Sequence, residues 1–434
     1  MQGLVAVALW LTLVVGLQLV GVISSFPAWA DPLVPVPVLV IVADTLRPRP
    51  YLLRSGRLPA RRTLYWVGAG ASGAAAALGL AALLAPAPTT DQPYTIVCAA
   101  RDLWHGVDPY RTFEPQCLRQ LGSPLTAVTP LESGPFASLG RYPSNQRIKR
   151  VLRRDQASGT HAGFPPYGYP PEATLLVLPV AFLGWTLVAL FVIALTALLL
   201  FAIWGRAGPG LALGLAWQLA ALSVLWVSFR WNPEDIAYLI LALAWARIDR
   251  PRLSSVAMAA AVCSNPLTWV CLPVYLAVLA RDPARRQRWA WLAGSLLAGV
   301  LPWVLWDHQL PAQLWRFVTL PEFPLGATPS TLLPLPSHLH WLFDLAFVAG
   351  IALATLVAWR SPQWRWGMAV LVYASFLVSW RAPLYYVMPV LWLSPAVAIG
   401  ATRLGAAGLV PASSRAGALR RRGWSVRRAR PSPS

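Results

Sequence analysis

The hydrophobic residues of this chain form long uncharged runs that are separated by short polar segments. A transmembrane helix needs about 20 consecutive apolar residues. Runs that approach or exceed this length span residues 3–26, 64–85, 173–205, 207–229, 253–280, 289–306 and 382–402. Shorter or interrupted candidates span residues 32–46, 236–246, 339–359 and 366–380. The pattern predicts an all-α fold, a polytopic membrane bundle of roughly 10–12 transmembrane helices with one long external loop.

The amino-acid composition also indicates a membrane protein. The chain is 57% hydrophobic and only 12% charged, which excludes a soluble globular enzyme and a disordered chain. The run at residues 3–26 lacks a basic segment in front of it, so we interpret it as a retained helix and not as a signal peptide. We divide the chain into an N-terminal hairpin with an arginine-rich loop (residues 1–63), a membrane core (64–402) and a basic tail (403–434).

The arginines predict an orientation. They crowd the segments 47–62, 247–252, 281–288 and 415–430, and threading the chain through its apolar runs places all four segments on one side. By the positive-inside rule this side is the cytoplasm, where both termini then lie and where the basic tail would contact anionic lipids. Most acidic residues fall on the other side. Any carboxylate chemistry is therefore expected outside the cell.

The longest polar segment, residues 86–171, is the predicted external loop. A helix is expected over residues 93–105, with proline at its first position and Gly106 after its last turn. Asp91, just before this helix, could cap it or could serve as a catalytic base. Residues 141–154 read either as an amphipathic helix on the outer membrane surface or as a solvated basic loop. Cys98 and Cys117 lie in this oxidising compartment and could pair.

Several short pieces of sequence occur in a suggestive order: Asp91-Gln-Pro-Tyr94, Ala99-Ala100 and Gly106-Val-Asp-Pro-Tyr110, followed by Tyr169-Pro-Pro171 and Arg381-Ala-Pro-Leu-Tyr385. Together they resemble glycosyltransferase family 87, whose members are polyprenyl-phosphate-sugar-dependent membrane enzymes of the GT-C superfamily and include bacterial mannosyltransferases. The likeness covers roughly residues 64–402. It implies a multi-pass enzyme of the bacterial plasma membrane that moves a mannose-like hexose from a polyprenyl phosphate to a glycolipid or glycan acceptor on the outer face.

The resemblance places the family's catalytic aspartate at Asp91. A base there would take the proton of the acceptor hydroxyl, and cations would stabilise the departing phosphate. Family members often carry Lys-Pro where this chain has Asn265-Pro266, so another cation must bind the phosphate. Arg381, which we expect in a tight turn, is the first candidate, and Arg230 is the second. The remaining substrate-binding candidates are His161, Tyr110, Tyr169, Glu234, Asp235 and Tyr385.

No metal or other cofactor is expected, because a single phosphate needs none and His338 with His340 is too small a set for a metal site. Asp344, about one turn into an apolar helix, is a secondary functional candidate. Two alternatives stay open. One is a lipid or solute transporter, although no internal repeat is visible and the middles of the runs are nearly free of charge. The other is an inactive GT-C-like scaffold.

Overall fold

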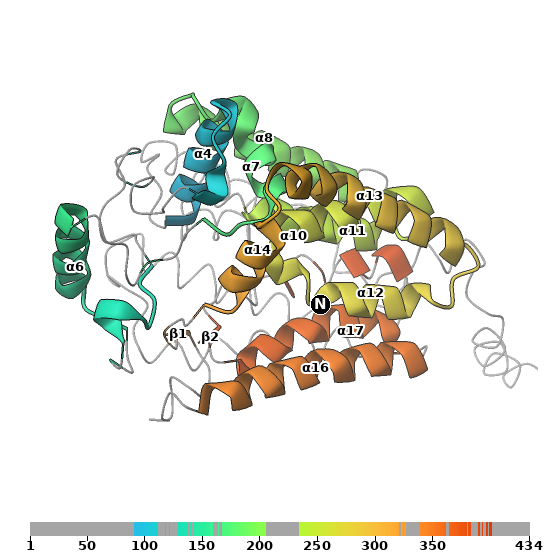
Figure 1. The fold of residues 1–434 in the computed structure, drawn as a ribbon. Helices are drawn as coiled ribbons and strands as arrows, with labels where there is room; N and C mark the ends of the chain where they lie inside the picture. Colours follow the sequence, from blue (N-terminus) through green and yellow to red (C-terminus); the bar gives the residue numbers. More distant parts are fainter. Residues whose placement is uncertain are drawn as a thin grey trace, which may run out of the picture.

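The computed structural model describes residues 91–111, 142–158, 167–204, 234–320, 339–361 and 364–379, and shorter stretches between and after them. These residues are almost entirely helical (Figure 1), as predicted. The α-helices are α4 (Asp91–Trp104), α6 (Asn145–Ser158), α7 (Pro171–Val177), α8 (Trp185–Trp204), α10 (Glu234–Ala246), α11 (Pro251–Ser264), α12 (Cys271–Leu279), α13 (Arg285–Trp306), α14 (Leu310–Val318), α16 (His340–Arg360) and α17 (Arg365–Leu371). The 3₁₀ turns are η2 (Pro109–Arg111), η4 (Gly134–Phe136), η5 (Leu178–Val180), η6 (Pro266–Thr268) and η8 (Val372–Val378).

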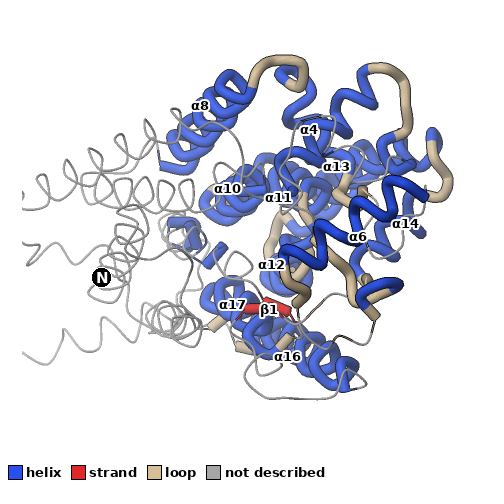
Figure 2. The backbone as a smooth tube through the Cα atoms, turned by 90° about the vertical axis from the view of Figure 1, so that its left-hand side faces the viewer, coloured by secondary structure: helices blue, strands red, loops and turns tan. Residues whose placement is uncertain are grey.

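One small exception to the helical fold is a strand pair. β1 (Leu325–Gly326) and β2 (Arg381–Ala382) run parallel, with Leu325 opposite Arg381. Figure 2 shows β1 as a short strand among helices. The prediction of a tight turn at Arg381 is therefore wrong. The backbone there is extended because it pairs with a segment more than 50 residues earlier in the chain.

Two of the predicted spans are continuous helices in the structure. Among the described residues, α13 and α16 are long and apolar enough to cross a membrane, and a third span exists if one bent helix pair is counted. That pair, Pro171–Val180 and Trp185–Thr196, bends by 118° within the run predicted as one span over 173–205. Pro179 lies within η5, and proline cannot donate the helical hydrogen bond, so the helix ends there.

The predicted run 253–280 is also interrupted, between α11 and α12. Asn265 ends α11 in an extended conformation, and its side-chain oxygen accepts a hydrogen bond from the backbone N–H of Leu267 at 2.8 Å. The Thr268 hydroxyl donates to the carbonyl of Ala261 at 2.9 Å. These bonds replace the helical ladder at the break. The residue that stands at the family's Lys-Pro position is thus a buried cap for η6.

After the break the chain turns back toward the end of the bundle at which α11 begins. The hydroxyls of Ser254, near the start of α11, and Tyr275, in α12, share a hydrogen bond of 2.7 Å. The two helices therefore form a hairpin, which we call the α11–α12 hairpin, and both of its ends lie at the same end of the bundle. In Figure 1, α12 lies between α11 and the lower helices α17 and α16.

Arginines gather at this end of the bundle. Arg288, which is only 1% exposed, pairs with Asp282 at 2.9 Å and donates to the carbonyl of Ile248. Arg365 lies within electrostatic range of Arg281 and Asp282. The segments 247–252 and 281–288 therefore meet at one end, as the threading of the sequence predicted. The other end of α13, about 33 Å away at 1.5 Å per residue, is Trp306.

Helix α6 confirms the amphipathic helix expected at residues 141–154, but not its location on the membrane surface. Its apolar side chains Ile148, Val151 and Leu152 are buried in a cluster with Tyr94 and Phe136, and its basic residues are exposed. The apolar face is already covered by protein, so it is not available for lipid.

The remaining predicted runs, at residues 3–26, 32–46, 64–85 and 207–229, lie outside the described residues, and 382–402 is described only at scattered positions. Cys98 is disulfide-bonded, and Cys117, with which it could pair, lies outside the described residues. Cys263 and Cys271 are free and buried.

Candidate functional site

Three tyrosines pack together at the end of the bundle opposite the arginines. The ring of Tyr167 lies 5.3 Å from that of Tyr110 and 5.8 Å from that of Tyr169. The hydroxyl of Tyr110 donates to the carbonyl of Tyr169 at 2.8 Å, and the Tyr167 hydroxyl is hydrogen-bonded to that of Thr174. The structure thus brings together two predicted substrate-binding residues, Tyr110 and Tyr169. The hydrogen bond from the Tyr110 hydroxyl connects the first part of the predicted external loop to its last part.

Carboxylates surround this tyrosine cluster. Burial raises the pKa of Tyr110 well above its usual value, and electrostatic interactions with Tyr167, Glu172, Asp108 and Asp307 raise it further. Burial likewise raises the pKa of Tyr167. Both phenols are therefore neutral at physiological pH and act as hydrogen-bond donors. The result is an acidic, aromatic layer at this end of the molecule.

The Gly-Val-Asp-Pro-Tyr piece of the family-like pattern forms the turn after α4. Gly106 has φ +71°, a left-handed conformation that favours glycine, and it ends the helix as predicted. The carboxylate of Asp108 accepts a hydrogen bond from the backbone N–H of Tyr110 at 3.0 Å. These residues therefore hold the tyrosine cluster against α4 and α7.

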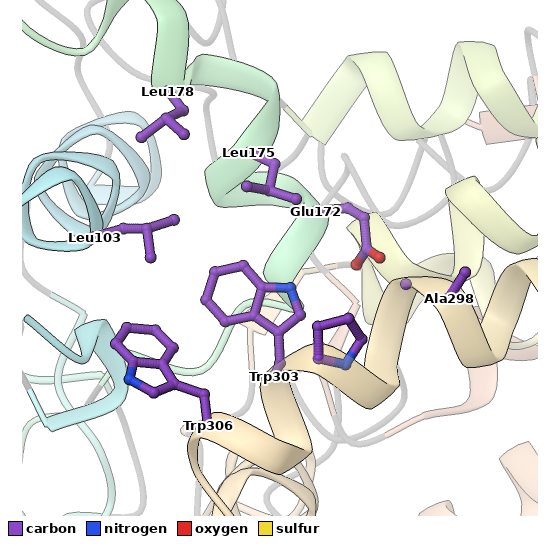
Figure 3. Close-up of a pocket in the computed structure, with 9 residues that line it drawn as sticks. Leu103, Glu172, Leu175, Leu178, Ala298, Trp303 and Trp306 are labelled. Atoms are coloured by element: carbon purple, nitrogen blue, oxygen red, sulfur yellow. The ribbon is translucent and has the colours of Figure 1, made fainter. Parts of the chain in front are cut away.

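Beside this layer lies a cavity of about 480 Å³ between α4, α7, η5 and α13. It is open on one side, and its walls are mostly apolar. Figure 3 shows Trp303 and Trp306 of α13 on one wall, Leu175 and Leu178 on another, and Leu103 of α4 facing them. The described residues that line it are Leu103, Glu172, Leu175, Leu178, Ala298, Gly299, Pro302, Trp303 and Trp306.

Glu172 is the one ionisable side chain among these lining residues. Its carboxylate lies over Gly299, where an added Cβ would stand 2.2 Å from Oε1, and it accepts a hydrogen bond from the thiol of Cys263. Within the described residues its second oxygen, Oε2, is buried without a hydrogen-bond partner. A glycine in α13 is thus what allows the carboxylate to sit against that helix.

A proline interrupts the hydrogen bonds of α13 at the same wall. Pro302 lies inside α13 and has no N–H to donate to the carbonyl of Ala298, one turn earlier. Both residues line the cavity. The cavity combines two indole rings with the carboxyl of Glu172, and a complementary ligand would carry a hydrogen-bonding group and apolar faces.

Asp91, the predicted catalytic base, is the first residue of α4, and only its backbone is described. Leu103, which lines the cavity, is 12 residues further along α4, or about 18 Å at 1.5 Å per residue. Tyr94, close to Asp91 in sequence, packs against Trp185 and the α6 cluster. Asp91 and the Glu172 cavity therefore occupy different ends of α4.

The other predicted residues are less completely described. Glu234 and Asp235 begin α10, as expected of acids at a helix start, and Arg381 lies in β2; only the backbone of these three is described. His161, Arg230 and Tyr385 lie outside the described residues. Asp344 is 65% exposed on α16, 3.8 Å from His340, which suits a weak surface pair better than a buried site.

Glu172 was not among the residues singled out from sequence. It directly precedes an apolar run, where a carboxylate resembles an ordinary helix start. The available signal lay elsewhere, in Gly299 and Pro302 within the apolar run 289–306, since both types are unfavourable inside a helix unless something requires them.

Comparison of the chain with protein families, with curated proteins and with solved structures finds no match.

Proposed function

We propose that this chain is a GT-C-like membrane glycosyltransferase that moves a mannose-like hexose from a polyprenyl phosphate to an acceptor on the extracytoplasmic face. The family-like pieces of sequence support the reaction. The observation that carries the proposal is the polarity of the bundle: arginines gather around Arg288 at one end, and carboxylates gather around Tyr110 at the other. If the arginine end is cytoplasmic, the carboxylates face outward, where lipid-linked sugars are used.

Chemically, transfer needs a base for the acceptor hydroxyl and a cation for the leaving phosphate. Asp91 is the proposed base, because its position at the start of α4 matches the family pattern. Arg381 and Arg230 are the proposed phosphate partners, since a guanidinium can bind phosphate oxygens in a bidentate manner. The pairing of β2 with β1 would fix the backbone of Arg381.

The test is a membrane assay with a panel of radiolabelled polyprenyl-phosphate sugars. We expect transfer from a hexose donor by the wild type and a loss of 10²–10⁴-fold in Asp91→Asn, the typical contribution of general base catalysis. Asp344→Asn removes an exposed carboxylate and serves as the control, with activity unchanged. Absence of transfer from every donor would reject the enzyme and leave the transporter and scaffold alternatives. Retention of more than about a tenth of the activity in Asp91→Asn would reject that residue as the base.

A further inference from the structure

We propose that the cavity between α7 and α13 binds the hydroxyl-bearing head of a neutral membrane glycolipid, with Glu172 accepting a hydrogen bond from a head-group hydroxyl. The inference goes beyond the proposed function, because Asp91 lies at the other end of α4, about 18 Å from Leu103 of the cavity wall. The binding site is argued from the structure alone.

The first argument is the chemistry of the walls. Glu172 has a buried oxygen without a partner among the described residues. This oxygen can accept a hydrogen bond, which a ligand with a hydroxyl group can donate. Trp303 and Trp306, with ring centroids 5.6 Å apart, offer flat apolar faces beside this acceptor. Sugar rings combine hydroxyl donors with C–H faces and fit such walls.

The second argument is charge. Among the described residues that line the cavity, Glu172 is the one ionisable side chain and none is basic, and the neighbouring layer contains Asp108 and Asp307. An anionic phosphate in the cavity would lie beside carboxylates with no cation from those walls. The phosphate of the donor is therefore expected elsewhere, and the occupant of the cavity should be neutral.

The third argument is access from the bilayer. The open cavity lies on α13, whose side chains Leu297, Leu301 and Leu305 are 61%, 49% and 77% exposed. Leu175, on the opposite wall, is 42% exposed. An apolar strip of this kind, on a helix long enough to cross a membrane, suits the hydrocarbon chain of a lipid whose head occupies the cavity.

Gly299 provides a sharp test. A methyl group at position 299 would collide with Oε1 of Glu172, the far end of a flexible side chain, so Gly299→Ala should displace the carboxylate without unfolding the helix. Gly294, one and a half turns earlier on α13, has open space around its Cβ position. Gly294→Ala is therefore the matched control. Glu172→Leu removes the acceptor outright.

The experiment is photo-crosslinking of the full-length protein in lipid nanodiscs, without donor sugar. The probe is a dialkylglycerol mannoside with a diazirine in one chain, and a diazirine-bearing polyprenyl phosphate and a choline-headed lipid are compared with it. We expect the mannoside to label α7 and α13. Glu172→Leu and Gly299→Ala should reduce that labelling by about tenfold, the loss expected for one hydrogen bond to a charged group, and Gly294→Ala should not.

Unchanged mannoside labelling in both variants would overturn the inference, as would labelling outside α7 and α13. Equal competition by the choline-headed lipid would show that the carboxylate selects a cation instead. This assay contains no donor sugar and measures binding, not turnover. The binding result can therefore be interpreted even if the proposed glycosyl transfer is not observed. Conversely, transfer that persists with no mannoside labelling would reject only the lipid site.

Discussion

The carboxylate of Glu172 occupies the space in which a side chain at position 299 would lie. The two residues are 127 positions apart in sequence, yet a Cβ on Gly299 would stand 2.2 Å from Oε1 of Glu172. The glycine is therefore required by the glutamate, and the stability effects of changing them should be coupled.

That coupling can be measured in a double-mutant cycle. Gly299→Ala should lower the thermal unfolding midpoint of the wild type more than that of a Glu172→Ala background, because the nearest colliding atom is then absent and only Cys263 Sγ, 3.2 Å from the added Cβ, remains close. Residues in direct contact typically show coupling free energies of about 0.5–3 kcal/mol. Additive effects within about 0.3 kcal/mol would contradict the contact.

The buried ion pair at the arginine end should be essential for stability. Arg288→Gln leaves Asp282 without its ion-pair partner and removes the donor to the carbonyl of Ile248. Removing one partner of a buried pair costs about 3–5 kcal/mol, which should lower the unfolding midpoint strongly in scanning fluorimetry. Arg286→Gln, on the same helix but exposed, is the control and should be neutral. Equal effects of the two variants would show that Arg288 acts only through total charge.

The hydroxyl of Tyr110 is predicted to be structural. Tyr110→Phe removes the buried hydrogen bond to the carbonyl of Tyr169 and leaves that carbonyl unsatisfied, at a cost of about 1–3 kcal/mol in the free energy of unfolding. Donor affinity should be unchanged if the hydroxyl only ties the loop. A selective rise in the KM for donor, with stability unaffected, would restore the substrate-binding role expected from sequence.

Arg381 is predicted to bind the donor phosphate in a bidentate manner. Arg381→Lys keeps the charge but loses the planar fork, so it should weaken donor binding by about tenfold, as judged from KM or from direct titration with polyprenyl phosphate. Arg316→Lys, at an exposed arginine of α14, is the control and should bind donor normally. Normal donor binding by Arg381→Lys would indicate a headgroup anchor and would move the assignment to Arg230.

Orientation can be tested with two exposed positions at opposite ends of the described structure. Lys149→Cys, on α6, should react with a membrane-impermeant maleimide in intact cells. Arg286→Cys, at the arginine end, should react only after permeabilisation, because the positive-inside rule places it in the cytoplasm. The free native cysteines Cys263 and Cys271 are buried and should contribute little labelling. The reverse pattern would invert the topology and the proposed site with it.

Hydrophobic runs predicted the helices well where one helix fills one run, as for α13 and α16. The helix expected at residues 93–105 is present as α4, which begins two residues earlier. Runs broken by proline, at Pro179 and Pro266, were predicted as single spans. Hydropathy measures how apolar a segment is, but it does not show where the chain changes direction. The β1–β2 pair and the burial of the apolar face of α6 depend on partners distant in sequence.

Dependence on partners distant in sequence also explains which residues of the candidate site were predicted and which were missed. Tyr110 and Tyr169 were identified because each belongs to a short local pattern. Glu172 was missed because its role comes from Gly299 and Cys263, two residues on helices that only the tertiary fold brings to it. Local sequence shows which residues carry chemistry, whereas the packing of helices decides which of them share a cavity.

The α11–α12 hairpin leaves and re-enters the same end of the bundle, so it contributes an even number of passages through the structure. Its insertion or loss during evolution would therefore leave the orientation of every later helix unchanged. The tip of the hairpin is less free to vary, because Asn265 and Thr268 are buried there and hydrogen-bonded to backbone groups. A change at the tip would also reach the candidate site, since Cys263 lies next to it in sequence and contacts Glu172.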